Sequence, residues 1–263
     1  MIEKFRILWE YVKFLLKSRS VFRIHSPFIY SLYTEVLMKH ASNSVDHTIR
    51  KVEELAADLY SCKDPLQLSD VGEKSRIIRN STVGRRAKTL SQSVKGGRIL
   101  HRLVRKFGHG NVLELGTGAG VSALYMAAAS EDAQIFSIEG NSVMANIARG
   151  LIMQSGFPNI TIYDGLFDDV LPEILKNLNE LQVVFIDGDH KSESLFRYYD
   201  MISPFLKENS VVVLHDIYWS ADMQKAWKTL IARPEVSISV DIFHFGMLFY
   251  HKGTEKQHFV LRV

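Results

Sequence analysis

Cysteine is nearly absent from this chain, because Cys62 is the only one among its 263 residues. A single thiol excludes an internal disulfide and any zinc site built on several thiolates, and it suits a reducing compartment. Long hydrophobic runs are also missing, since no apolar run approaches the roughly 18–20 residues that span a bilayer. Near the N-terminus, Glu10 and Lys13 interrupt the apolar core that a signal peptide requires. We therefore expect a soluble cytoplasmic protein without a transmembrane segment.

Acidic side chains are missing from one part of the sequence, residues 74–106, which we call the basic segment. It contains eleven Lys and Arg and no Asp or Glu, although the formal net charge of the whole chain is only +3. Such a block attracts an anionic ligand or a nucleic acid. The alternative is a solvated helical face beside an acidic partner surface, which is how charge runs are usually used.

The sequence pattern of the first 107 residues predicts a helical extension. Apolar side chains recur at helical spacing between Phe5 and Leu16, and Pro27 ends this pattern because it disfavours a helical conformation at the residue before it. Further helices are expected at residues 29–38 and 47–60. The apolar face of the first helix is compatible with a homodimer.

From Asn111 onward, short apolar runs alternate with helical stretches, which predicts βαβ units and a mostly parallel sheet. An antiparallel pair of strands at residues 236–243 and 247–250 follows, and residues 258–263 are a candidate for one more edge strand. We therefore predict an α/β fold over residues 108–263, a Rossmann-like doubly wound seven-stranded sheet with an antiparallel edge hairpin, preceded by the helical extension and basic cover segment of residues 1–107. The five expected parallel strands are 111–115, 134–138, 160–163, 183–186 and 211–214, with helices near 120–130, 141–155, 169–179, 191–206 and 221–232.

A glycine-rich turn follows the first expected strand, in the sequence Glu114-Leu115-Gly116-Thr117-Gly118-Ala119-Gly120. Glycines at such a turn let the backbone bend sharply and approach a ligand. The dinucleotide fingerprint G-x-G-x-x-G is not met, because position 121 is Val. An acid two residues before the first glycine suits a cationic or amine-bearing ligand better than a pyrophosphate.

All five expected parallel strands end in carboxylates. Taken alone, each is explained as a helix cap or a turn residue, but ligands of open α/β sheets bind at the carboxyl ends of the strands. Five acidic strand ends therefore predict a ligand site at that edge. The turns are Glu114 before the glycines, Glu139-Gly140, Asp164-Gly165, Asp187-Gly188-Asp189-His190 and His215-Asp216.

The motif at residues 114–120, followed in order by Glu139, Asp164-Gly165 and Asp187, resembles the class I S-adenosylmethionine-dependent methyltransferases. The resemblance covers about residues 75–263. Within it, residues 186–190 and 215–220 look like small bacterial O-methyltransferases related to the catechol and caffeoyl-CoA type. The segment His25-Ser26-Pro27-Phe28 looks like an N-terminal motif of small bacterial members.

The resemblance implies S-adenosylmethionine as the cofactor. Glu114 would hold its amine, directly or through water, Glu139 would accept charge-assisted hydrogen bonds from the ribose hydroxyls, and Asp164 would meet the adenine amine. The cofactor-binding positions implied in this way are Glu114, Gly116, Thr117, Gly118, Gly120, Glu139, Gly140, Asp164, Gly165 and Asp187.

Methyl transfer to oxygen requires that the acceptor be positioned and its proton removed. His190 and His215 are the candidate bases, because imidazole titrates near neutral pH, and Asp187 and Asp216 are the other candidate catalytic residues. Catechol-type relatives hold a divalent cation with an Asp after strand four and an Asp-Asn pair after strand five, but Ile217 replaces that Asn. A site for Mg²⁺ or another divalent cation formed by Asp187, His215 and Asp216 is therefore left as an alternative.

The sequence predicts a methyltransferase that modifies a hydroxyl or carboxylate of a small molecule, anionic or phenolic in character, with Arg79, Arg85 and Arg86 as candidate acceptor contacts. Two other functions stay open. One is an RNA methyltransferase that uses the basic segment, although no base-methylation motif or RNA-binding module is present. The other is a non-catalytic protein that binds the same cofactor.

Overall fold

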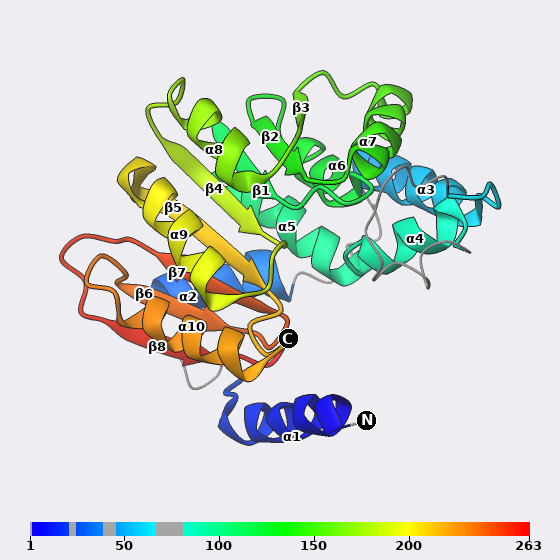
Figure 1. The fold of residues 1–263 in the computed structure, drawn as a ribbon. Helices are drawn as coiled ribbons and strands as arrows, with labels where there is room; N and C mark the ends of the chain where they lie inside the picture. The colour runs from blue at the N-terminus through cyan, green and yellow to red at the C-terminus, as the bar shows by residue number, and fades with distance from the viewer. Residues whose placement is uncertain (1, 21–24, 39–45, 67–80) are drawn as a thin grey trace.

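The computed structural model describes residues 2–20, 25–38, 46–66 and 81–263, so Arg79 and the part of the basic segment before residue 81 lie outside it. A single sheet forms the centre of the described structure, with the strand order β3-β2-β1-β4-β5-β7-β6-β8 (Figure 1). The strands are β1 (Asn111–Leu115), β2 (Gln134–Glu139), β3 (Ile160–Asp164), β4 (Leu181–Ile186), β5 (Leu206–His215), β6 (Ile238–Asp241), β7 (Phe245–Phe249) and β8 (Gln257–Val260).

Strands β1 to β5 pair in parallel, whereas β7 pairs antiparallel with both β5 and β6. This arrangement confirms the predicted doubly wound fold with an antiparallel edge hairpin. The count differs by one, because the sheet has eight strands rather than seven. The additional strand is β8, which pairs in parallel with β6 and lies in the run that the sequence marked as a candidate edge strand.

Helices cover both faces of the sheet (Figure 1). The helical elements are α1 (Ile2–Lys17), α2 (Pro27–Ser31), the π-helical turn η2 (Leu32–Leu37), α3 (His47–Ser61), α4 (Val83–Leu90), α5 (Val94–Phe107), α6 (Val121–Ala127), α7 (Ser142–Ser155), α8 (Phe167–Leu175), α9 (Ser192–Ile202), the 3-10 turn η4 (Ser203–Phe205) and α10 (Ala221–Ala232).

The core has two layers, one on each face, because successive strand residues point to opposite sides. Val112 and Val183 pack into the layer that includes α2, η2, α5 and α6. Their neighbours Leu113 and Val184 pack into the layer under α8, α9 and α10. Near-continuous apolar strands are therefore buried on both faces, as expected for a parallel sheet between helices.

The segment His25-Ser26-Pro27-Phe28 starts α2 and fixes it to the sheet. The Ser26 hydroxyl accepts a hydrogen bond from the Ile29 N–H at 3.4 Å, which caps the helix. The Phe28 ring lies edge-on to Phe249 of β7, with the centroids 5.0 Å apart. The structure thus gives this segment a packing role.

Helix α1 lies beside the end of the sheet that carries β8 (Figure 1). The Arg19 N–H donates to the Val260 carbonyl at 2.9 Å, and the Arg6 guanidinium donates to the carbonyls of Tyr218 and Trp219. The opposite side of the helix is apolar and exposed, with Trp9 at 60% and Leu16 at 82% of full exposure. Among the described residues, no helix is both long and apolar enough to cross a membrane.

Some cations in the described part of the basic segment are paired with acids of the same chain. Arg98 of α5 pairs with Glu53 of α3 at 2.7 Å, and Lys106 pairs with Glu35 of η2 at 2.7 Å. Arg102 donates to the Val36 carbonyl at 2.5 Å. For α5, the structure thus matches the alternative in which the basic face lies beside an acidic surface.

We expect Gly97→Ala to destabilise the fold, because a Cβ at this position in α5 would collide with the buried ring of Tyr125 in α6. Overpacking of this kind typically costs about 1–3 kcal/mol. Gly150→Ala in α7 is the matched control, since a Cβ there meets no atom within 4 Å and alanine stabilises a helix by roughly 0.5–1 kcal/mol over glycine. Chemical denaturation measures both variants, and equal stabilities would contradict the packing argument.

Candidate functional site

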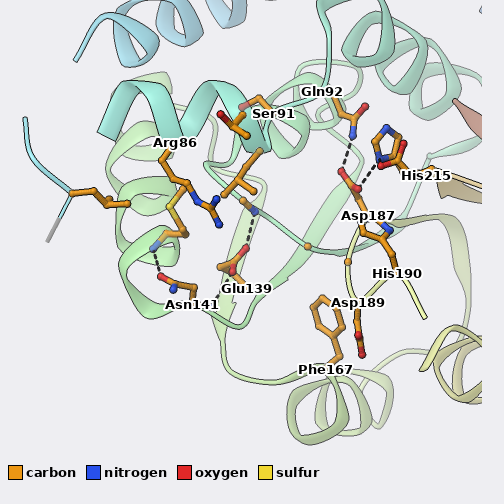
Figure 2. A pocket seen from close by; sticks show the side chains of 18 residues that line it. Arg86, Ser91, Gln92, Glu139, Asn141, Phe167, Asp187, Asp189, His190 and His215 are labelled. Atoms are coloured by element: carbon orange, nitrogen blue, oxygen red, sulfur yellow. Dashed lines mark hydrogen bonds and ion pairs between the residues drawn. The ribbon is translucent and has the colours of Figure 1, made fainter. Parts of the chain in front are cut away.

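A cavity of about 440 Å³ lies at the carboxyl ends of β1, β2, β4 and β5; we call it the main cavity (Figure 2). Gly116 and Gly118 contribute backbone from the turn after β1, and Glu139 comes from the end of β2. Helix α4 and the loop after it close the other side. This is the edge of the sheet at which the acidic strand ends predicted a ligand site.

The glycine turn needs its glycines for two reasons. Gly116, Gly118 and Gly120 have φ values of 103°, 55° and 88°, in the left-handed region that side chains disfavour. A Cβ on Gly116 would also collide with the backbone carbonyl oxygen of Asp187. The turn is tied to β2, because the Thr117 N–H donates to the Ile138 carbonyl at 3.1 Å.

Glu139 is a fixed carboxylate on the cavity wall. Its Oε2 accepts a hydrogen bond from the Gly118 N–H at 2.7 Å, and its Oε1 accepts one from the Asn141 N–H at 2.9 Å. Burial raises the pKa of Glu139, while these two hydrogen bonds and the charge of Arg86 act in the opposite direction. The remaining lone pairs of the carboxylate are available to accept hydrogen bonds from hydroxyl groups.

Glu114 lies beneath the turn and does not line the cavity. It is completely buried and accepts a hydrogen bond from the Ser137 hydroxyl, which lies 2.6 Å from the Thr117 hydroxyl. Burial raises the pKa of Glu114 to about 8, against the lowering effect of hydrogen bonds from Ser122 and Ser137. In this structure Glu114 supports the turn from below.

The structure separates the predicted residues into two groups. Brought together on the wall of the main cavity are Gly116, Gly118, Glu139, Asp187, His190, His215 and Asp216. Away from the wall are Glu114, Thr117, Gly120, Gly140, Asp164 and Gly165. Asp164 is exposed and accepts a hydrogen bond from the Ser142 hydroxyl at 3.0 Å.

Asp187 and His215 form a hydrogen-bonded pair between the ends of β4 and β5. The Asp187 Oδ1 lies 2.8 Å from the His215 Nδ1, and its Oδ2 accepts a hydrogen bond from the Gln92 amide at 2.6 Å (Figure 2). Burial lowers the pKa of His215, but the hydrogen bond and the charges of Asp187 and Asp216 outweigh it, so the pKa lies above 6.5. An Nδ1 proton directed at the carboxylate leaves Nε2 of the neutral ring as an acceptor.

The same contacts do not fit a divalent cation at Asp187, His215 and Asp216. Both carboxylate oxygens of Asp187 accept hydrogen bonds from nitrogen donors, whereas hard cations need free oxygen ligands. Ile217 is 1% exposed and packs in the core, so it offers no ligand. Across the described ranges, no group of three or more His, Cys, Asp or Glu is placed to hold a metal ion.

Several residues of the site carry no sequence signal. Gln92 lies 95 positions before Asp187 and reaches it through the loop between α4 and α5. Asn141, Met144 and Phe167 line the cavity from elements that follow β2 and β3. Of the candidate acceptor contacts, Arg86 lines the main cavity beside Glu139 (Figure 2), and Arg85 does not. His190 lines it as well, with its ring 6.1 Å from that of Trp219.

Residues 113–217 match the family model of a methyltransferase domain. This match agrees with the family resemblance of the strand-end motifs. No curated protein matches the chain in sequence.

Three solved structures show the same fold at low sequence identity. An O-methyltransferase of Bacillus cereus, in complex with S-adenosylhomocysteine, is 19% identical, with a TM-score of 0.55, over 81% of this chain and 94% of that one. The O-methyltransferase TomG of Streptomyces achromogenes, in complex with S-adenosylmethionine, is 18% identical, with a TM-score of 0.55, over 79% and 91%. A putative caffeoyl-CoA O-methyltransferase of Staphylococcus aureus is 16% identical, with a TM-score of 0.53, over 77% and 91%.

We expect Glu114→Gln to flatten the pH dependence of stability. The folded-state pKa of about 8 lies above the ordinary value of 4.5, so the folded state keeps a proton that the unfolded chain releases. The free energy of unfolding therefore falls as the pH rises from about 4.5 to about 8, by at most about 1.4 kcal/mol per pH unit. In thermal unfolding measured between pH 5 and pH 8, the stability of Glu114→Gln relative to the wild type should therefore increase with pH. Glu173→Gln, on an exposed helix position, is the control, and parallel curves for Glu114→Gln and wild type would contradict the assignment.

Proposed function

We propose, from the premise that the chain carries a methyltransferase domain at residues 113–217, that this methyltransferase uses S-adenosylmethionine and methylates an oxygen atom of a small molecule. The observation that carries the proposal is the Asp187–His215 pair on the wall of a cavity that the glycine turn and Glu139 also line. Such a pair is suited to removing a proton from a hydroxyl group.

The main cavity fits this cofactor. Its volume of about 440 Å³ is in the usual range for ligand sites, and the backbone of Gly116 and Gly118 lines it together with the Glu139 carboxylate. Gly116 and Gly118 would hold the methionine part and Glu139 the ribose hydroxyls. When bound, S-adenosylmethionine supplies an electrophilic methyl group on a sulfonium. The adenine contacts assigned to Asp164 and Gly165 stay predictions, because neither residue lines the cavity.

His215 is the proposed base. Asp187 holds the imidazole through Nδ1 and stabilises the imidazolium that forms when Nε2 accepts the proton of the acceptor. Gln92 holds Asp187 in turn by donating to its second oxygen. No step is assigned to a metal ion, since the donor set does not fit one.

The RNA alternative is weaker, because Arg98 and Lys106 of the basic segment are engaged in ion pairs within the chain. The cytoplasmic location stays a prediction. The homodimer does too, and its support is the exposed apolar face of α1.

We expect Glu139→Ala to weaken the binding of S-adenosylmethionine and S-adenosylhomocysteine by about tenfold or more, because it removes a charge-assisted acceptor for the ribose. Calorimetry of the wild type and the variant measures this, and Glu255→Ala, at an exposed position away from the cavity, is the control. Mg²⁺ or a chelator should leave the affinity unchanged. Equal affinity in Glu139→Ala and wild type would argue against the proposed cofactor site.

We expect His215→Asn to lower the rate of methyl transfer to hydroxylated aromatic acids by about 10²–10⁴-fold while the binding of S-adenosylhomocysteine is kept. In the wild type, the rate should fall as the pH drops through the His215 pKa, which lies above 6.5, because the protonated ring accepts no proton. Product formation is followed by mass spectrometry, with the exposed His47→Asn as control. A loss seen in His190→Asn and not in His215→Asn would assign the base to His190.

A further inference from the structure

A second cavity of about 380 Å³ adjoins the main cavity; we call it the aromatic cavity. Its walls come from α1, the loop between α4 and α5, the start of α5, the turn between β6 and β7, and residues 262–263. Ser91, Gln92 and His215 line both cavities. The proposed base therefore stands in the wall between them, with one side toward each.

Aromatic rings form much of the wall of this cavity. Phe243 is the central one, with its ring centroid 4.8 Å from that of Tyr11 and 5.4 Å from that of Phe14. Phe245 lines the cavity beside His215, at 5.6 Å between ring centroids. A planar aromatic ligand can pack offset or edge-to-face against rings that line a cavity.

The backbone holds Phe243 in a strained conformation. Its φ of 72° lies in the left-handed region, where a bulky side chain is a genuine outlier. Two contacts enforce it: the Phe243 N–H donates to the buried Asp241 carboxylate at 2.8 Å, and the ring stacks on Tyr218 at 4.8 Å. The Tyr218 hydroxyl donates to the same carboxylate at 2.6 Å. Strain of this kind is typical of functional sites, and here it places a ring on the cavity wall.

The two cavities differ in charge. Glu139, Asp187, Asp189 and Asp216 line the main cavity, where Arg86 is the one cation besides histidine among the described lining residues. No Asp or Glu side chain is found among the described residues of the aromatic cavity, which Lys95 and Arg262 line instead. The charge of the main cavity suits a sulfonium cation, and the charge of the aromatic cavity suits an anion.

Lys95 and Arg262 are placed differently for this task. Arg262 is anchored to α1, because it donates to the Leu15 carbonyl at 2.8 Å and to the Ser18 hydroxyl at 3.3 Å. Lys95 makes no hydrogen bond or ion pair with the described part of the chain. A cation without a partner at the edge of an apolar cavity favours a ligand that carries a negative group.

We propose that the aromatic cavity binds the methyl acceptor and selects a planar aromatic molecule with an anionic substituent, which Lys95 and Arg262 hold while its hydroxyl oxygen meets His215. This inference rests on the proposed function. The acceptor oxygen forms the new bond to the methyl carbon as the carbon–sulfur bond breaks. The electron pair of that bond stays on sulfur, and the proton of the hydroxyl passes to Nε2 of His215. Lys95 and the rings of Tyr11 and Phe243 are then specificity-determining residues.

The test compares charged and uncharged probes of one shape, dihydroxybenzoate with dihydroxybenzamide and dihydroxycinnamate with dihydroxycinnamamide. Binding is measured by calorimetry on the full chain saturated with S-adenosylhomocysteine, and methyl transfer is measured by mass spectrometry. In the wild type, the acids should bind more tightly than the amides. Lys95→Met should weaken the binding of the acids by about 5- to 30-fold and leave the binding of the amides unchanged, since it removes one charge-assisted contact. Lys228→Met, at an exposed position of α10, should change neither.

A second pair of variants tests the aromatic wall. Tyr11→Ala should weaken the binding of acids and amides by the same factor, and Tyr11→Phe should bind both with the affinity of the wild type. Trp9→Ala is the matched control, because Trp9 lies on the same helix, is 60% exposed and does not line the cavity.

The outcomes separate the two proposals. Absence of S-adenosylhomocysteine binding by the folded wild type would overturn the proposed function. If S-adenosylhomocysteine binds, then tighter binding of the amides, failure of all four probes, or an equal effect of Lys95→Met on acids and amides would overturn the acceptor site alone.

Discussion

The backbone of Gly116 passes directly against the carbonyl oxygen of Asp187, and the site depends on this close approach. It brings the ends of β1 and β4 together without a side chain between them, while the Asp187 N–H donates to the Leu115 carbonyl at 2.8 Å. With its backbone held in this way, Asp187 meets His215 at the end of the next strand, and the open turn leaves space for a ligand. A side chain at position 116 would separate the two strand ends and move the Asp187 carboxylate that is hydrogen-bonded to His215.

Charge is divided between two neighbouring spaces. Glu139, Asp187, Asp189 and Asp216 place carboxylates on the wall of the main cavity, whereas the aromatic cavity has rings and two cations among its lining residues. His215 stands between them, where its pKa is raised by Asp187 and Asp216 against the effect of burial. A cationic methyl donor and an anionic acceptor would each be attracted to a different side of the His215 imidazole. This attraction would place the two molecules relative to each other without a metal ion.

The N-terminal residues have two physical roles. Helices α2 and α5 pack into the core beneath the sheet, and two cations of α5, Arg98 and Lys106, pair with acids of α3 and η2. Helix α1 is different, because it contacts the rest of the chain through Arg6 and through the rings of Tyr11 and Phe14 beside Phe243, with Arg19 bonded to β8 just after the helix. One side of α1 thus completes the aromatic cavity, and its other side leaves large apolar side chains exposed.

The sequence by itself determined the sheet, its parallel core and the edge at which the site lies. The periodicity of a strand is a local property of the sequence. The carboxyl ends of parallel strands lie at one edge of the sheet regardless of the conformation of the loops. Tertiary structure decided which of these residues line the main cavity. Glu114 lies one residue before the end of β1 and Glu139 is the last residue of β2. Glu114 is nevertheless buried under the turn, and Asp164 is exposed and does not line the main cavity. Gln92 and Phe243 reach the site from loops, and Lys95 reaches it from the first turn of α5, at positions that no periodicity records.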